Sequence, residues 1–170
     1  MAVVTTKALR ISNAEAAVQT LDSVVVNHGR KRTVVALVSA VSGDSILSQY
    51  RFARVHSSWR VTSIKVFNDA LGGTTAMNIG LYQTSANPNN GGAAVSATTY
   101  ASALSLVAAS TAGVEAKYQN NSIANATRQV WQDAGATADT NRWYELVGAL
   151  SAAVTSTGNI MVEVEYVGND

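Results

Sequence analysis

The sequence contains no cysteine, a single proline and few aromatic or charged side chains. The lack of cysteine excludes disulfide frameworks, thiolate zinc sites and cysteine nucleophiles. Charged residues make up 14% of the chain, compared with about 25% in a typical soluble protein. We expect uncharged polar surface, surface covered by other chains, or both to replace the missing charge. The composition therefore favours an oligomer or a component of a larger assembly.

Long apolar runs are also absent, and none approaches the roughly 18 residues of a membrane span. Near the start of the chain, Lys7 and Arg10 are followed by ISNAEAAVQT, which is not the basic-then-apolar pattern of a signal peptide. We therefore predict no membrane association and expect the chain to be made in a cytosol. Its 170 residues are typical of one ordinary domain.

The few charges are distributed unevenly. Residues 1–60 carry eight basic and three acidic side chains, a net charge of +5, whereas residues 61–170 carry four basic and eight acidic ones, a net charge of −4. Such polarity suits head-to-side contact between copies or docking on an acidic neighbour. The alternative is that folding intermingles the two halves and cancels the field.

Several segments show strand patterns. Residues 33–41, TVVALVSAV, are apolar on both faces, as expected of a strand covered on both sides. Residues 45–55 alternate cleanly. The next strand opens at Trp59 and Val61, and its apolar positions then shift by one residue, which predicts a bulge near Thr62–Ser63. The turn NDALGG leads to a strand with Met77, Ile79 and Leu81 on one face.

The second half of the chain is more mixed. Residues 84–98 predict a surface loop, residues 100–109 a short helix, and RQVWQDA a second helix capped by Thr127 and closed by Gly135. Residues 142–150 and 159–167 predict two final strands joined as a hairpin through TSTGN. The total is seven or eight strands with one or two short helices. We predict a mainly β protein, an antiparallel β-sandwich over residues 33–170, preceded by an N-terminal arm or peripheral segment over residues 1–32.

Catalytic patterns are missing from the sequence. His28 and His56 have no carboxylate at a suggestive spacing, and neither a G-x-S-x-G elbow nor a glycine-rich phosphate loop occurs. Glu163 and Glu165 fit a solvated or subunit-facing strand better than a glycosidase pair. We predict no enzyme activity, no metal and no cofactor.

The segment GRKR lacks the interleaved aromatics of a nucleic-acid groove, which argues against direct nucleic-acid binding. Three tryptophans lie near the ends of predicted elements: Trp59, Trp131 and Trp143. We interpret them as anchors in the core or at an interface, and the alternative is a platform on which a sugar stacks.

One extended pattern resembles a known group of proteins. YRFARVHSSWRVTSIKVFNDAL, then MNIGLYQT, QVWQDAG and a closing GNIMVEVEYV are similar to small structural proteins of tailed bacteriophages. In that group a strand of the type Y-R-F-A-R-V leads into R-V-x-S-I-K-V and then D-x-G-L-Y, whereas this chain has Asn78 at the acidic position. The resemblance covers roughly residues 45–167 and carries no catalytic residues.

The resemblance implies a capsid decoration (cement) protein with a jelly-roll type β-sandwich, assembled as a trimer. It also implies major capsid subunits as partners and a place on the virion head after assembly in a bacterial cytoplasm. The alternative is a tail, neck or receptor-binding protein that recognises carbohydrate. From charge and expected exposure we select candidate contact residues in the arm, the basic turn and the surface loop: Lys7, Arg10, Arg30, Lys31, Arg32, Asn87, Asn89 and Asn90.

Overall fold

Strands dominate the part of the chain that the computed structural model describes, residues 18, 29–85 and 92–168. Two short helical turns, η1 (Ile123–Asn125) and α3 (Val130–Asp133), lie between the sixth and seventh strands. None of the helices in these residues is long and apolar enough to cross a membrane. The eight strands in chain order are β1 (Lys31–Ala40), β2 (Gln49–His56), β3 (Arg60–Asn68), β4 (Ala76–Gln83), β5 (Ala94–Ser105), β6 (Ser110–Glu115), β7 (Trp143–Ala152) and β8 (Gly158–Val167).

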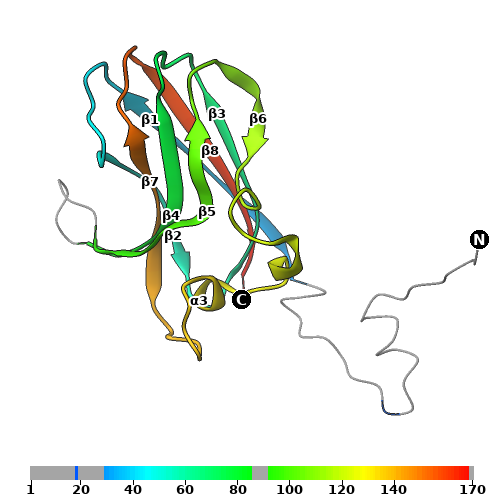
Figure 1. Ribbon diagram of the computed structural model, residues 1–170. Helices are drawn as coiled ribbons and strands as arrows, with labels where there is room; N and C mark the ends of the chain where they lie inside the picture. Colours follow the sequence, from blue (N-terminus) through cyan, green and yellow to red (C-terminus); the bar gives the residue numbers. More distant parts are fainter. Residues whose placement is uncertain (1–17, 19–28, 86–91, 169–170) are drawn as a thin grey trace, which may run out of the picture.

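The strands form two four-stranded antiparallel sheets that pack face to face (Figure 1). One sheet has the order β1-β8-β3-β6 and the other the order β2-β7-β4-β5. Only β4 and β5 are consecutive strands in the same sheet, and every other connection crosses to the opposite sheet. Two sheets of four strands wrapped in this way are jelly-roll-like. The predicted mainly β antiparallel sandwich is confirmed.

The core lies between the two sheets and is built from alternating residues. On β8, Ile160, Val162, Val164 and Tyr166 point inward and are buried, as their period of two predicts. β8 pairs along its whole length with β1 on one side and from Ile160 to Val167 with β3 on the other. Facing it, β7 and β4 contribute a second set of buried side chains, Tyr144, Leu146, Leu150, Met77, Ile79 and Leu81.

Strand β7 is buried on its outward face as well. Val147 and Ala149 point away from the core, yet they are 0% and 5% exposed. β5, which lies on the far side of β4, covers part of this face, because its Ala97 packs against the cluster that contains Val147 and Ala149. The backbones of β4 and β5 approach closely there, since a Cβ on Gly80 of β4 would lie 2.1 Å from the carbonyl oxygen of Ser96. Only glycine allows so close a backbone approach. Both faces of β7 are therefore buried within the described chain.

Several local predictions are confirmed. The register of β3 against β8 shifts between Val61 and Ser63, which places the predicted bulge correctly. Gly72 and Gly73 adopt positive φ angles of 70° and 55° in the turn before β4. Gly135, with φ at 76°, follows the short helix α3, although Gln129 rather than Thr127 is its N-cap.

Four other predictions are wrong. Residues 100–109 are not a helix, because β5 runs to Ser105. Residues 45–48 belong to a loop, so that strand begins at Gln49, and residues 94–98 are strand rather than loop. The final two strands do not form a hairpin, since β7 and β8 lie in opposite sheets. Strand β6 was not predicted at all. The boundary at residue 32 remains a prediction, because most of residues 1–28 lie outside the described part.

The inward face of β8 provides a test of this core. Replacing Ile160, which is fully buried, with alanine (Ile160→Ala) is expected to lower the free energy of unfolding by about 2–5 kcal/mol, because it removes buried methyl groups and leaves a cavity. Ile123→Ala is the matched control, since Ile123 is 78% exposed, and we expect a change within about 0.5 kcal/mol. Urea unfolding monitored by tryptophan fluorescence measures both. Equal costs for the two variants would contradict the sandwich core.

Candidate interaction surface

Exposed large apolar side chains gather on β1 and the loop that follows it. Within the described residues nine large hydrophobic side chains are exposed, and five of them lie in the thirteen positions 35–47. We call these five residues the apolar edge: Val35, Leu37, Val41, Ile46 and Leu47. Exposed apolar residues scattered singly are normal, whereas a cluster marks an interaction site.

The alternation of β1 explains why two of these side chains point to solvent. Val34, Ala36 and Val38 face the core and are partly buried, which leaves Val35 and Leu37 on the outer face, 58% and 67% exposed. β1 is also the outermost strand of its sheet. The sequence predicted a strand covered on both sides, but no element of the described chain covers this outer face. The apolar pattern was correct, but among the residues that the structure describes nothing covers the outer side of β1.

A shallow hollow of about 260 Å³ lies beside the apolar edge on the outer face of the same sheet. Leu37, Met161 and Phe67 stand opposite one another on β1, β8 and β3 and form its apolar floor. At its rim, the Asp69 carboxylate accepts hydrogen bonds from the backbone N–H and side-chain amide of Asn159, at 2.8 and 3.1 Å. The hollow thus has a polar rim held in place and an apolar floor open to a partner.

The loop after β1 is held in a defined conformation. The Asp44 carboxylate accepts hydrogen bonds from the Tyr50 hydroxyl at 2.7 Å and from the Val41 backbone N–H at 3.0 Å, and both lower the pKa of Asp44. Leu47 has a positive φ of 72°, an uncommon conformation for a residue with a side chain, and its N–H donates to the Leu150 carbonyl. The loop therefore presents Ile46 and Leu47 on a fixed backbone.

The structure describes three of the eight candidate contact residues. Arg30, Lys31 and Arg32 are exposed at the start of β1, where Lys31 forms an ion pair with Glu165 of β8. These basic residues and the apolar edge thus lie toward opposite ends of one strand and its following loop. The remaining candidates lie outside the described residues: Lys7, Arg10, Asn87, Asn89 and Asn90.

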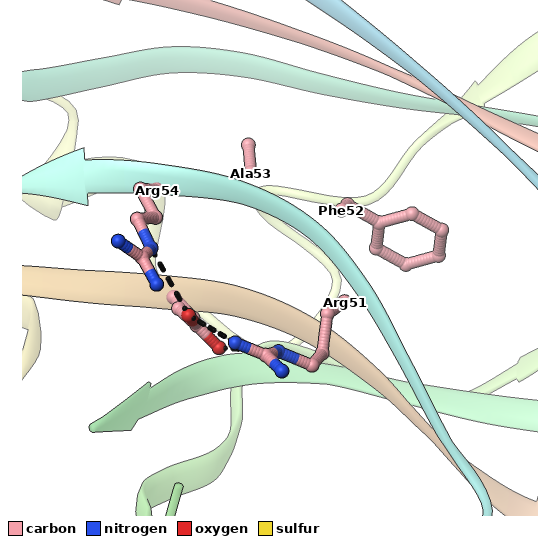
Figure 2. Close-up of a pocket in the computed structure, with 5 residues that line it drawn as sticks. Arg51, Phe52, Ala53 and Arg54 are labelled. Atoms are coloured by element: carbon pink, nitrogen blue, oxygen red, sulfur yellow. Dashed lines mark hydrogen bonds and ion pairs between the residues drawn. The ribbon is translucent and has the colours of Figure 1, made fainter. Parts of the chain in front are cut away.

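A second hollow of about 260 Å³ lies on the outer face of the other sheet and contains an ionic cluster (Figure 2). Arg51 donates from Nε and Nη2 to the two carboxylate oxygens of Glu145, at 2.7 and 2.6 Å. The Nε of Arg54 donates to Oε1 of the same carboxylate at 3.2 Å. The Glu145 side chain is 3% exposed, whereas that of Arg54 is 59% exposed. Two guanidinium groups therefore hold one carboxylate, and the cluster keeps a positive charge that faces solvent.

No local sequence pattern predicts this cluster, because its members are far apart in the chain. Arg51 and Arg54 lie on β2 and Glu145 lies on β7, and only the antiparallel pairing of these strands brings them together. Burial alone would raise the pKa of Glu145, but the hydrogen bonds and charges of Arg51 and Arg54 outweigh it and hold that pKa below its ordinary value. The cluster ties edge strand β2 to its neighbour, and its outer arginine offers a contact for an acidic partner.

Ionisable groups inside the molecule serve the fold. Lys117 is fully buried, its Nζ donates to the carbonyl of Val61, and burial lowers its pKa. Asp133 of α3 accepts hydrogen bonds from Tyr100 at 3.2 Å and from Asn121 at 3.3 Å. These bonds fasten the segment that carries α3 to the end of the sandwich. Lys117 and Asp133 thus each have hydrogen-bond partners within the described fold.

The histidine that the structure describes belongs to an aromatic cluster. The His56 ring lies 5.1 Å from that of Trp143, and Trp59 lies 5.1 Å from Trp143 and stacks on Tyr166 at 4.2 Å. His56 Nδ1 lies 2.8 Å from the Ser58 hydroxyl. Trp143 is 46% exposed, so the cluster is partly a surface feature. No three His, Cys, Asp or Glu side chains among the described residues are grouped to hold a metal ion.

The Glu145 cluster makes acid stability testable. A carboxyl group whose pKa is lower in the folded state stabilises the protein above its unfolded pKa, near 4.5, and this contribution is lost as the pH falls toward the folded value. We expect Glu145→Gln to lower the free energy of unfolding by about 2–3 kcal/mol at pH 7, because two arginines lose their charged acceptor.

The loss of stability on acidification should also be shallower in that variant than in the wild type. Urea unfolding at pH 7, 5 and 3 measures both effects. Glu163→Gln, on the outer face of β8, removes the same charge outside this cluster and serves as the control. Equal stabilities of the two variants at pH 7 would contradict a structural role for the Glu145 cluster.

Comparison with known proteins finds a similarity in fold to a solved structure. No family model and no curated protein matches the sequence. Among solved structures, a chain of the cyanophage Pam1 capsid asymmetric unit is similar, with a TM-score of 0.56 and 16% sequence identity. The match covers 92% of this chain and 96% of that chain. At this identity the likeness concerns the fold, which the two chains share over almost their whole lengths.

Proposed function

We propose that this chain is a structural protein of a bacteriophage virion, and specifically a capsid decoration protein that stabilises the head. The observation that carries the proposal is the similarity in fold, over 92% of this chain, to a chain from a phage capsid. The apolar edge and the low charge support it, since both are expected of a chain that other proteins cover in the assembled state.

The mechanism is physical and needs no chemistry. A decoration protein binds where major capsid subunits meet, so that separating the subunits also breaks its contacts with them. A standard interface buries about 1,600 Å², of which the entropy of association leaves only part as net stability. Because many copies bind around one shell, a modest stabilisation by each copy adds up to a large one for the whole capsid. The tightly paired strands of both sheets provide the stiff body that such a bridge requires.

The proposal includes partners and a location. The copies form a homo-oligomer, with a trimer as the expected state, and sit on the head surface in contact with the major capsid protein after assembly in the bacterial cytoplasm. Basic residues of the arm and of the basic turn, at positions 7, 10 and 30–32, and the loop at residues 87–90 are proposed to face the shell. The positive first third of the sequence suits an acidic neighbour.

A binding experiment on phage heads tests this proposal. Heads produced without this chain are mixed with the purified protein, and bound copies are located by electron microscopy and counted by quantitative gel analysis. We expect copies over the icosahedral shell and a higher temperature of DNA release from the loaded heads. Density confined to the tail, or heads that bind no protein, would refute the decoration role.

The same assay tests the arm. Replacing two basic residues with glutamine (Lys7→Gln with Arg10→Gln) is expected to weaken binding to the heads about three- to tenfold, because exposed interface charges contribute roughly 0.2–1 kcal/mol each. Arg128→Gln with Arg142→Gln is the matched control, since it removes the same charge from exposed positions elsewhere. If both double variants bind alike, the arm does not contact the shell.

A receptor-binding role is the second candidate, and one observation favours it. The exposed ring of Trp143, supported by Trp59 and His56, has the form of an aromatic platform on which a sugar stacks. Neither described hollow is lined by a tryptophan or tyrosine. Quenching of tryptophan fluorescence by host surface glycans, abolished in Trp143→Ala, would favour this role over decoration of the head.

A further inference from the structure

Within the described part of the chain, β1 is an edge strand that lacks the usual protection of its outer side. All ten of its residues pair with β8 in one unbroken register, and within the described residues no strand pairs with its other side. A long, regular and apolar edge offers a row of backbone N–H and C=O groups to any extended chain. Natural proteins protect such edges with charges, bulges, short strands or covering segments.

The other three edge strands carry these protections. β2 has a register shift between Arg51 and Ala53 and bears the arginines of the Glu145 cluster. β5 shows three register shifts against β4. β6 has only six residues, a shift in its pairing with β3 and a glycine with φ at 76°. Among these four edge strands, only β1 lacks a bulge, and from Thr33 to its end it presents uncharged side chains. β1 therefore differs from the other three.

We propose that β1 pairs antiparallel with β1 of a second copy about a two-fold axis at Ala36. This pairing joins the β1-β8-β3-β6 sheets of the two copies into one eight-stranded sheet. In this register Val35 lies opposite Leu37 of the second copy, and Leu37 opposite Val35. Both side chains are on the outer face and more than half exposed in the single chain. Cross-strand apolar pairs are the unit of sheet stabilisation, so each copy covers the apolar side chains that the other exposes.

The charges at the two ends of the strand fit the same arrangement. Residues 33–43 carry no charge, Arg30, Lys31 and Arg32 precede them and Asp44 follows them. Antiparallel pairing places the start of one β1 beside the end of the other, so the basic residues of each copy approach Asp44 of the other. A parallel arrangement would instead place the basic residues side by side, and like charges so placed are destabilising. Charge thus favours the antiparallel two-fold.

This inference does not rest on the proposed virion role, because a contact between copies is testable on the purified chain alone. It is also compatible with a trimer, since a two-fold contact through β1 joins two assemblies as well as two single chains. Pairing of two such units through β1 gives a species with twice the molar mass of the single chain or of the trimer.

Light scattering and sedimentation over a range of concentrations test the contact. We expect the wild-type mass to double with concentration and the dissociation constant to rise at least tenfold in Leu37→Lys, which places a charge in the paired edge. Ile123→Lys is the matched control, because Ile123 is 78% exposed, compared with 67% for Leu37, and lies in η1 rather than in β1. Circular dichroism and urea unfolding confirm that both variants fold. A wild type that does not self-associate, or a Leu37→Lys variant that associates like the wild type, overturns the proposal.

Cross-linking tests the register, since the chain has no cysteine of its own. Thr33 lies opposite Ser39 of the second copy in the proposed pairing, with their Cβ atoms about 5 Å apart. The same residue in the two copies is about 20 Å apart, because six residues separate positions 33 and 39 along the strand. A mixture of Thr33→Cys and Ser39→Cys chains should therefore cross-link with a short thiol reagent far faster than either variant alone. Faster linkage within a single variant refutes the two-fold at Ala36.

Discussion

Antiparallel pairing on both sides of β8 and β7 is the constraint on which the rest of the molecule depends. β8 is held between β1 and β3, and β7 between β2 and β4, over nearly their full lengths. Once these ladders fix the two sheets, the alternation of side chains decides which residues meet in the core. The same alternation decides which residues must face outward, and on β1 these are Val35 and Leu37. The exposed apolar edge is thus a direct consequence of the pairing that builds the core.

The sequence predicted the elements whose signal is local. The strict alternation from Ile160 to Tyr166 identified β8 and its inward face, and the one-residue shift after Val61 located a bulge. The glycine pair at positions 72–73 indicated a tight turn with positive φ. In each case the residues that carry the signal lie next to one another in the chain, and the physical cause is a backbone preference or a period of two.

Predictions failed where distant segments decide the structure. In β5, bulges and the positive φ of Ala103 break the alternation, so that buried Tyr100 and Leu104 acquire the spacing of a helix. The strands β7 and β8 look like a hairpin because a short turn joins them, although each has its partners in a different sheet. The Glu145 cluster joins residues more than ninety positions apart, and nothing near Glu145 in the sequence indicates its partners. Pairing across the sheet, not local propensity, determines all three features.

The low charge of the chain becomes more informative once the structure places the charges. Glu145 and Lys117 are buried, and Asp133 is partly withdrawn from solvent, so the surface carries even less charge than the composition indicates. A protein with few surface charges has little electrostatic repulsion to keep copies apart, and a bare apolar strand edge then promotes association.

The other edge strands of the described sandwich are nevertheless protected, by arginines at β2 and by bulges at β2, β5 and β6, so protection is missing at one edge only. A single unprotected edge on an otherwise protected rim is expected when that edge is covered in the working assembly, because an edge that stayed exposed would drive uncontrolled aggregation. The low surface charge and the regular, apolar edge of β1 therefore support the same interpretation. In it, the free chain is an incomplete unit, and another protein chain extends its β1-β8-β3-β6 sheet.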